Sequence, residues 1–187
     1  MKSKPKVIML AAGRSRRFGS NKLLYRMHDG RPMILHALEP YLECGLDISC
    51  ICHEKDKDLR HLLIEKNIDV ITLSSSGFDN GMGDSIANGV LQKPSGSGWL
   101  IALADMPYLK RETLHALLPR YHNSIVRPRY GTNPGHPVYF PKRFREELTA
   151  LKGEEGGRKL FKNEKLHLIT VFDRGCIQDI DFPSDIL

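Results

Sequence analysis

The run VIMLAAGRSRRFGSNKLL, residues 7–24, decides the fold and the class of function of this chain. It starts with a short apolar segment, Val7–Leu10, which predicts a buried strand. Small residues at 11–13 follow and leave room for a ligand, and three arginines and Lys22 come next. Backbone N–H groups and cations at the end of a strand favour phosphate binding. An exposed cationic turn is the alternative, but the Ala-Ala-Gly start and the paired arginines favour the phosphate site.

This loop is neither of the two common phosphate-binding motifs. Gly13 and Gly19 are six residues apart with no Gly-Lys-Ser after them, and the G-x-G-x-x-G dinucleotide fingerprint is absent. Residues 10–24 instead resemble the signature loop of the MobA-like nucleotidyltransferases, L-A-[AG]-G-x-S-x-R-[MF]-G-x-x-K. The resemblance implies that Arg17 and Lys22 neutralise a departing pyrophosphate. It also implies nucleotide-binding roles for Leu10, Ala11, Ala12, Gly13 and Arg14.

Length, charge and cysteine content limit the classes of protein. A chain of 187 residues suits one domain, with a nucleotide-binding half over about 1–110 and an acceptor-binding half over about 111–187. No apolar run reaches the ~18 residues that cross a bilayer, and the start MKSKPK lacks a cleavable signal pattern, so we expect a cytoplasmic protein without a membrane partner. The net charge of +6 is modest and no nucleic-acid-binding motif accompanies it, so no nucleic acid is expected. The four cysteines form no C-x-x-C pair, which argues against a zinc site or disulfides, and Cys50 and Cys52 are expected on one strand face.

Strand and helix patterns alternate along the chain. This alternation predicts a three-layer α/β/α, Rossmann-like domain with a mainly parallel sheet. In such sheets ligands bind beyond the carboxyl ends of the strands, so the loops after Leu10, Leu73 and Ala104 are expected to face one site. Strands are expected at Val7–Leu10, Ile48–Cys52, Val70–Leu73, Trp99–Ala104, Ile125–Arg127, Pro137–Phe140 (as an edge strand), Leu168–Val171 and Ile177–Ile180. Helices are expected at Met33–Cys44, Lys57–Lys66, Met82–Leu91, Glu112–Leu118 and Lys142–Leu151, with a final short turn near Ser184.

Asp105 stands directly after the apolar run IALA, residues 101–104. A carboxylate at the carboxyl end of a central strand is well placed to bind Mg²⁺. A helix cap is the alternative, but the next predicted helix begins near Arg111, too far along for Asp105 to cap it. The segment also resembles the L-x-D-M-P element of the same family, which implies that Asp105 is a magnesium ligand.

Four further segments resemble elements of this family. Gly81-Met82-Gly83-Asp84-Ser85 is similar to G-M-x-x-S, which implies nucleotide contacts for Gly81 and Ser85; Asp84 replaces a small residue, and ordinary helix capping by Asn80 or Asp84 is the alternative. Residues 135–138, Gly-His-Pro-Val, imply an acceptor-lining role for His136 and Pro137. Residues 153–158 resemble G-D-x-G-[AG]-R and place Arg158 near the acceptor phosphate, with a solvated turn as the alternative. The ending Asp179-Ile180-Asp181 resembles D-I-D, and either acid could be a second metal ligand.

The resemblance implies a magnesium-dependent transfer of CMP from CTP to the molybdenum–molybdopterin cofactor, with release of pyrophosphate. Cytidylyl-transferring members usually carry Ala where guanylyl-transferring members carry Gly, and this chain has Ala12. A molybdoenzyme or its chaperone is a possible protein partner. Two alternatives stay open: transfer to another phosphorylated acceptor or from GTP, and a non-catalytic carrier or chaperone of the molybdenum cofactor.

Overall fold

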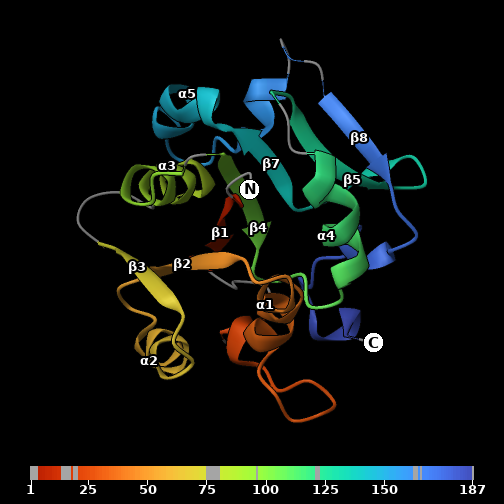
Figure 1. The fold of residues 1–187 in the computed structure, drawn as a ribbon. Coiled ribbons are helices and arrows are strands. Elements are labelled where there is room, and N and C mark those ends of the chain that lie inside the picture. The colour runs from red at the N-terminus through yellow and green to blue at the C-terminus, as the bar shows by residue number, and fades with distance from the viewer. Residues whose placement is uncertain are drawn as a thin grey trace.

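The computed structural model describes residues 4–13, 18, 21–74, 81–95, 97–120, 123–161, 164 and 166–186. An eight-stranded mixed sheet runs through them in the order β3-β2-β1-β4-β7-β5-β6, with β8 paired to β5 (Figure 1). The strands are β1 Lys6–Leu10, β2 Asp47–His53, β3 Asp69–Leu73, β4 Gly98–Leu103, β5 Ile125–Tyr130, β6 Asn133–Pro134, β7 Val138–Pro141 and β8 Leu166–Thr170. The helices are α1 Met33–Glu43, α2 Lys57–Glu65, α3 Met82–Gln92, α4 Arg111–Leu117 and α5 Arg145–Thr149.

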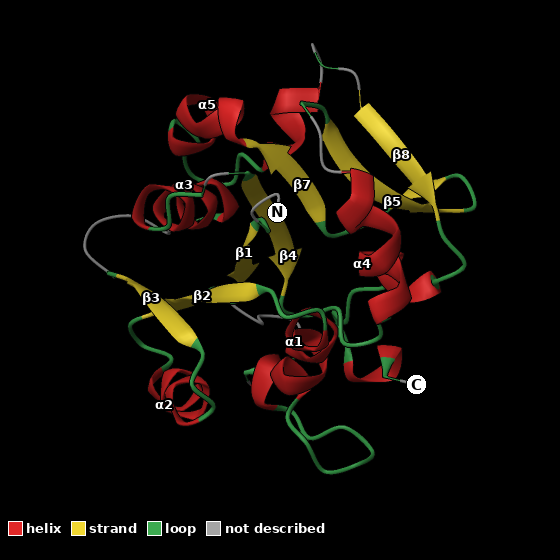
Figure 2. Ribbon diagram, viewed as in Figure 1, coloured by secondary structure: helices red, strands yellow, loops and turns green. Residues whose placement is uncertain are grey.

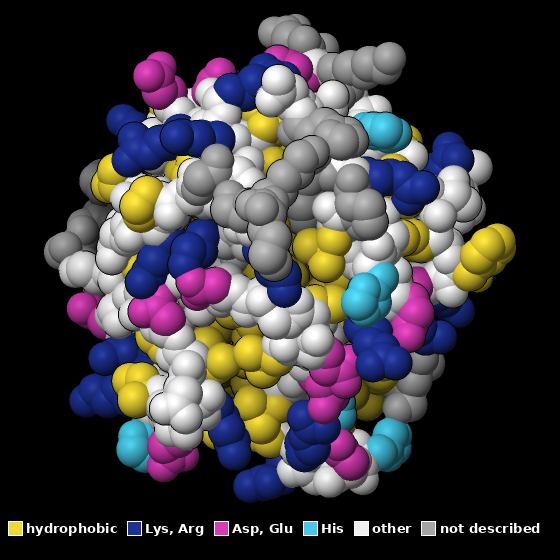
Figure 3. All heavy atoms as spheres, in the orientation of Figure 1, with side chains coloured by type: hydrophobic (Ala, Val, Ile, Leu, Met, Phe, Trp, Pro, Cys, Tyr) yellow, Lys and Arg dark blue, Asp and Glu magenta, His cyan; other side chains and the backbone are white. Residues whose placement is uncertain are grey.

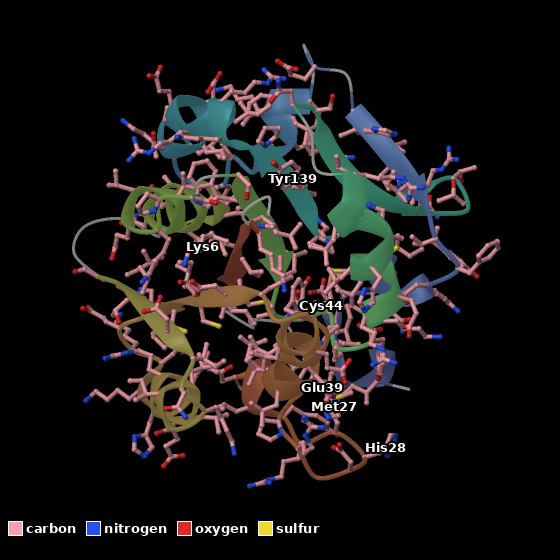
Figure 4. The ribbon with its side chains drawn as sticks, in the orientation of Figure 1. Lys6, Met27, His28, Glu39, Cys44 and Tyr139 are labelled. Atoms are coloured by element: carbon pink, nitrogen blue, oxygen red, sulfur yellow. The ribbon has the colours of Figure 1, made fainter. Side chains whose placement is uncertain are left out.

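The first strand lies at the centre of a parallel half-sheet. β1 pairs in parallel with β2 on one side and with β4 on the other, so Ile8 lies level with Ser49 and with Ile101. Both neighbours are buried for most of their length. A strand covered on both faces needs an unbroken apolar run, and this is why residues 7–10 predict the centre of the sheet. An ion pair between Lys6 and Asp47 joins the starts of β1 and β2, and Lys6 is labelled in Figure 4.

Helices cover both faces of the sheet, as Figure 2 shows. Alternate residues of β1 point to opposite faces: Val7 and Met9 pack with α1, α2 and α4, whereas Ile8 packs with α3 and α5. Cys50 and Cys52 both point to the first of these faces and are buried free thiols, as predicted. The three-layer α/β/α fold expected from the sequence is confirmed.

The half-sheet from β7 onward differs from the sequence prediction in two places. Pro137–Phe140 was expected at an edge, but β7 lies between β4 and β5 and is antiparallel to both. Pro137 precedes the strand and therefore removes no donor from its ladder. Ile177–Ile180 was expected as a strand, but a 3₁₀ turn covers Arg174–Ile177 and no strand follows it among the residues that the structure describes. Asp173 caps this turn, since its carboxylate accepts a hydrogen bond from the Gly175 N–H.

The surface mixes charges of both signs. On the face shown in Figure 3, Lys and Arg side chains are interspersed with Asp and Glu. In the part of the chain that the structure describes, no helix combines the length and the apolar character needed to cross a lipid bilayer.

Candidate active site

A cavity of about 490 Å³ opens beside the carboxyl ends of β1 and β4. The pairing of the two strands continues one residue past the end of β4, because the Ala104 N–H donates to the Leu10 carbonyl at 3.2 Å. Both halves of the chain contribute to the wall. The lining residues are Leu10, Met82, Ile86, Ile101, Leu103, Met106, Arg127, Asn133, Pro134, Gly135, His136, Val138, Phe140, Gly156, Gly157, Arg158, Phe161, Cys176, Ile177 and Asp179.

Three carboxylates meet beside this cavity, and one of them, Asp179, lines it. One oxygen each of Asp105, Asp179 and Asp181 lies within 4.8 Å of the others. The backbone brings them together: the Ile180 N–H donates to the Asp105 carbonyl at 2.9 Å, which places an acid on either side of this contact. Asp185 fixes the backbone at Asp181, since its carboxylate accepts a hydrogen bond from the Asp181 N–H at 2.9 Å. The sequence left open which of Asp179 and Asp181 joins Asp105, and the structure brings both to it.

The donor set fits a hard divalent cation. Carboxylate oxygens are the ligands that Mg²⁺ and Mn²⁺ prefer. Neighbouring oxygens around one octahedral Mg²⁺ at ~2.1 Å lie about 3 Å apart, so carboxylate oxygens that lie within 4.8 Å of one another reach one ion after shifts of less than about 2 Å. Asp105, Asp179 and Asp181 are therefore suited to hold such an ion together.

Lys22 reaches this acidic cluster from the far end of the first loop. Its ammonium donates to Asp105 Oδ2 at 2.7 Å, to the Ile180 carbonyl at 2.7 Å and to Asp181 Oδ1 at 3.4 Å. Asn21 fixes the start of the short 3₁₀ turn that carries Lys22, because its side-chain oxygen accepts from the Leu23 N–H. Only 8% of Lys22 is exposed. The structure thus brings together Lys22 and Asp105, which are 83 positions apart and which the sequence analysis had both proposed as site residues.

The remaining residues of the first loop are only partly described. Leu10 lines the cavity, Ala11 is buried and Ala12 packs against the core beneath α3. Around Gly13 the protein leaves open space, because a Cβ there would meet no described atom within 4 Å. Arg14 and Arg17 lie outside the described residues.

The start of α3 is tied to the loop at 153–158. A Cβ on Gly81 would collide with the Gly153 carbonyl oxygen, so only glycine allows this approach. Asp84 Oδ2 accepts from the Gly153 N–H at 2.8 Å and from the Gly81 N–H at 3.1 Å, and the Gly83 N–H donates to the Gly153 carbonyl. The capping alternative for Asp84 is therefore correct, and the same carboxylate bridges two segments. Ser85 is buried and donates to the Gly81 carbonyl, so its hydroxyl is engaged inside the helix; a nucleotide contact stays a prediction.

His136 and Arg158 both line the cavity, as expected for acceptor contacts. Pro137 is buried behind the lining and follows His136 through a cis peptide bond. Burial, and to a smaller extent nearby Arg127, lower the pKa of His136 to about 4, so its imidazole is neutral at pH 7. Its Nδ1 is buried and has no hydrogen-bond partner among the described residues. Arg158 is exposed at the rim of the cavity.

Sequence reasoning missed Arg127, which lies inside β5 and is only 9% exposed. Its Nε donates to the Gly135 carbonyl at 2.9 Å, and its guanidinium carbon lies 5.4 Å from the centre of the Phe161 ring. Burial, and next the nearby Arg158, lower the pKa of Arg127 from its ordinary value. The sequence feature that could have indicated this residue is a cation that directly follows two apolar residues in an extended segment, Ile125–Arg127.

Residues 7–168 match the MobA-like NTP transferase domain. The chain belongs to this family. It is 28% identical to the purine catabolism protein PucB of Bacillus subtilis, over 95% of this chain and 92% of that one. It is 27% identical to a probable molybdenum cofactor guanylyltransferase of Pyrococcus horikoshii, over 75% of this chain and 71% of the relative. Among solved structures, Rv0371c of Mycobacterium tuberculosis superposes with a TM-score of 0.84 at 23% identity, covering 98% of this chain and 96% of the other, and it has also been crystallised as a manganese complex.

The protein is therefore a nucleotidyltransferase of the MobA-like family. The match starts at the first strand and includes the signature loop, Asp105 and the Gly-His-Pro segment, so it supports the resemblance seen in the sequence. Asp179 and Asp181 lie beyond the matched range, and their place in the site rests on the geometry.

Proposed function

We propose that this protein transfers CMP from CTP to the terminal phosphate of the molybdenum–molybdopterin cofactor. The observation that carries the proposal is the cluster of Asp105, Asp179 and Asp181, which Lys22 joins and which borders the cavity through Asp179. A phosphate oxygen of the acceptor attacks the α-phosphorus of CTP, a new P–O bond forms, and the bond to the β-phosphate breaks as pyrophosphate leaves. Such a transfer needs alignment and charge neutralisation, with little covalent chemistry from the protein.

Mg²⁺ is the proposed metal, held by Asp105, Asp179 and Asp181. When bound, it supplies positive charge for the phosphate oxygens and for the charge that develops on the leaving pyrophosphate. The manganese complex of Rv0371c supports a divalent cation at this fold, since Mn²⁺ and Mg²⁺ prefer the same oxygen ligands.

Each remaining group has a role in binding or orientation. The Lys22 ammonium neutralises the pyrophosphate, the N–H groups at 12–14 hold its oxygens, and Arg17 adds charge. Gly81 and Ser85 are proposed contacts to the nucleotide. His136, Pro137 and Arg158 form the acceptor side, where the neutral imidazole can exchange hydrogen bonds without adding charge.

Ala12 supports CTP as the donor, because its methyl group narrows the space that a purine would need. A pocket that only lacks room discriminates by ~1–3 kcal/mol, so hydrogen bonds to the base must supply the rest. GTP is the second candidate, favoured by the name of the Pyrococcus horikoshii relative. A non-catalytic cofactor carrier is disfavoured, because a carrier has no use for the ion-paired Lys22 and Asp105.

The test is an incubation of the protein with each of the four NTPs, Mg²⁺ and purified molybdenum–molybdopterin cofactor, with pyrophosphate release as the readout. Release with CTP in clear excess over GTP supports the proposal, and mass spectrometry should identify the cytidine dinucleotide product. A preference for GTP would show that GTP, and not CTP, is the nucleotide donor. Release only with a different phosphorylated acceptor would replace the acceptor, and no release with any pair would favour the carrier.

A further inference from the structure

The Lys22 side chain leaves the backbone from a short 3₁₀ turn, and Asn21 organises that turn. Asn21 Oδ1 accepts a hydrogen bond from the Leu23 N–H at 3.1 Å, and the Asn21 carbonyl accepts one from the Leu24 N–H at 3.1 Å. The Tyr25 N–H then donates to the Lys22 carbonyl at 3.0 Å. The direction in which the Lys22 side chain points therefore depends on how the Asn21 amide is oriented.

Asp56 sets the orientation of this amide. Asn21 Nδ2 donates to Asp56 Oδ1 at 3.3 Å, across 35 positions of the chain. An ionised carboxylate only accepts hydrogen bonds, so it binds the NH₂ group of the amide and leaves the amide oxygen to the Leu23 N–H. A flipped amide would turn its NH₂ group toward the Leu23 N–H and its oxygen toward Asp56, and both contacts would be lost.

The loop after β2 holds Asp56 in place. The Asp56 N–H donates to the His53 carbonyl at 3.0 Å, and the Asp56 carbonyl accepts from the Arg60 N–H at 3.0 Å at the start of α2. The Glu54 N–H donates to the Leu73 carbonyl at 2.9 Å, which ties the same loop to the end of β3. The position of Asp56 is therefore fixed by the sheet and by α2.

The carboxylate of Asp56 is not used in the way that its place before a helix predicts. An Asp directly before a helix ordinarily accepts a hydrogen bond from an N–H group of the first turn. Asp56 directly precedes α2, but its side chain makes no such capping bond. It bonds instead to Asn21, the residue next to Lys22. Capping of α2 therefore does not account for this carboxylate, whereas its contact with the first loop does.

We propose that Asp56 is a positioning residue for Lys22. Through the Asn21 amide it holds the turn from which the Lys22 ammonium reaches Asp105 Oδ2 at 2.7 Å and Asp181 Oδ1 at 3.4 Å. This inference rests on the proposed transfer, in which Lys22 neutralises the pyrophosphate. It adds to that step a residue from the loop between β2 and α2, outside every segment that carries the family resemblance.

The test is calorimetric binding of CTP and of CMP in the presence of Mg²⁺, with Asp58→Ala, in the first turn of α2, as the matched control. Asp56→Ala should weaken CTP binding about 5- to 10-fold and CMP binding by less than about twofold, because the misplaced ammonium is assigned to the outer phosphates. Asp56→Asn keeps an oxygen acceptor for Asn21, so it should bind CTP within about twofold of the parent, as should Asp58→Ala. With Lys22→Met already present, Asp56→Ala should weaken CTP binding no further, because both residues act through one ammonium.

Unchanged CTP binding in Asp56→Ala, or an equal weakening of CTP and CMP, overturns the inference, and so does an additive loss in the double variant with Lys22→Met. A parent that binds CTP but releases no pyrophosphate refutes the proposed function and still tests the inference.

If the parent binds CTP no more tightly than CMP, the proposed role of Lys22 fails, and amide hydrogen exchange at Leu23 becomes the measurement. Faster exchange in Asp56→Ala than in the parent, Asp56→Asn and Asp58→Ala supports the inference, and equal exchange in all four proteins overturns it. Thermal unfolding shows whether each variant is folded. Asn21→Ala, which removes the amide between Asp56 and the turn, replaces Asp56→Ala in both measurements if that variant is unfolded.

Discussion

Asp84 offers a sharp test of how the two halves of the site are joined. Its carboxylate oxygen accepts from the Gly153 N–H at 2.8 Å and from the Gly81 N–H at 3.1 Å. Asp84→Ala removes the acceptor and leaves both donors without it. Because the Gly83 N–H still donates to the Gly153 carbonyl, the loop at 153–158 keeps one contact with α3.

The expected loss follows from these two contacts. A hydrogen bond to a charged group contributes ~1.5–3 kcal/mol where it is buried. Asp84 is half-buried, and water replaces part of what is lost, so we expect Asp84→Ala to lower the free energy of unfolding by about 2–3 kcal/mol. Asp84→Asn keeps an oxygen acceptor without the charge and should lose about half as much.

Urea denaturation of the parent and variants gives these differences directly. Asp58→Ala is the matched control, since Asp58 lies in the first turn of α2 and is exposed. It should lose about 0.5 kcal/mol, the amount expected for a carboxylate near a helix N-terminus. Amide hydrogen exchange at Gly153 should accelerate in Asp84→Ala alone. Equal losses in the two alanine variants, with unchanged exchange at Gly153, would show that Asp84 only caps its helix.

Four further outcomes are expected. Asp105→Asn should lower the rate of pyrophosphate release by about 10²–10³, or roughly 3–4 kcal/mol, without loss of the folded state by circular dichroism; near-normal turnover would remove Asp105 from the site. Lys22→Met should weaken binding of CTP more than of CMP by calorimetry, because its charge is assigned to the outer phosphates; equal losses would place Lys22 elsewhere. Ala12→Gly should reduce the ratio of kcat/KM for CTP over GTP, and an unchanged ratio would show that Ala12 does not limit the base pocket. His136 has a lowered pKa of about 4, so below about pH 6.5 this histidine takes up a proton in the unfolded chain but not in the folded protein. The free energy of unfolding should therefore fall by up to about 3 kcal/mol between pH 6.5 and 4. His136→Gln should reduce this pH dependence, whereas the control His61→Gln, at a side chain that is 77% exposed, should leave it unchanged.

Much of the parallel half-sheet could be predicted from the sequence because its strands are continuous apolar runs. Val7–Leu10 and Trp99–Ala104 have no other stable location than the centre of a covered sheet. Their carboxyl ends then meet at one edge, which is why the sequence alone predicts that Asp105 and the loop after Leu10 share one site.

The other half depended on contacts that no local pattern carries. Pro137–Phe140 has the length and the proline typical of an edge strand, and only its pairing with β4 and β5 places it inside the sheet. Ile177–Ile180 has apolar residues at both ends, but its backbone is committed to Asp105 and to the turn capped by Asp173. The burial of Arg127 could not be predicted locally, because the Phe161 ring that faces its guanidinium lies 34 positions further along the chain.

The continuity of the sheet limits how this enzyme can be rebuilt. β4 pairs with β1 on one side and with β7 on the other, and one buried cluster includes both Ile8 and Phe140. A chimera that exchanges everything after residue 110 would cut through this cluster, and a new β7 whose side chains do not fit Ile8 and its neighbours would pair poorly with the apolar edge of β4. Segments that contribute to the cavity wall, such as 133–137 and 153–158, are therefore better exchanged by grafting them onto an intact sheet than by recombining halves.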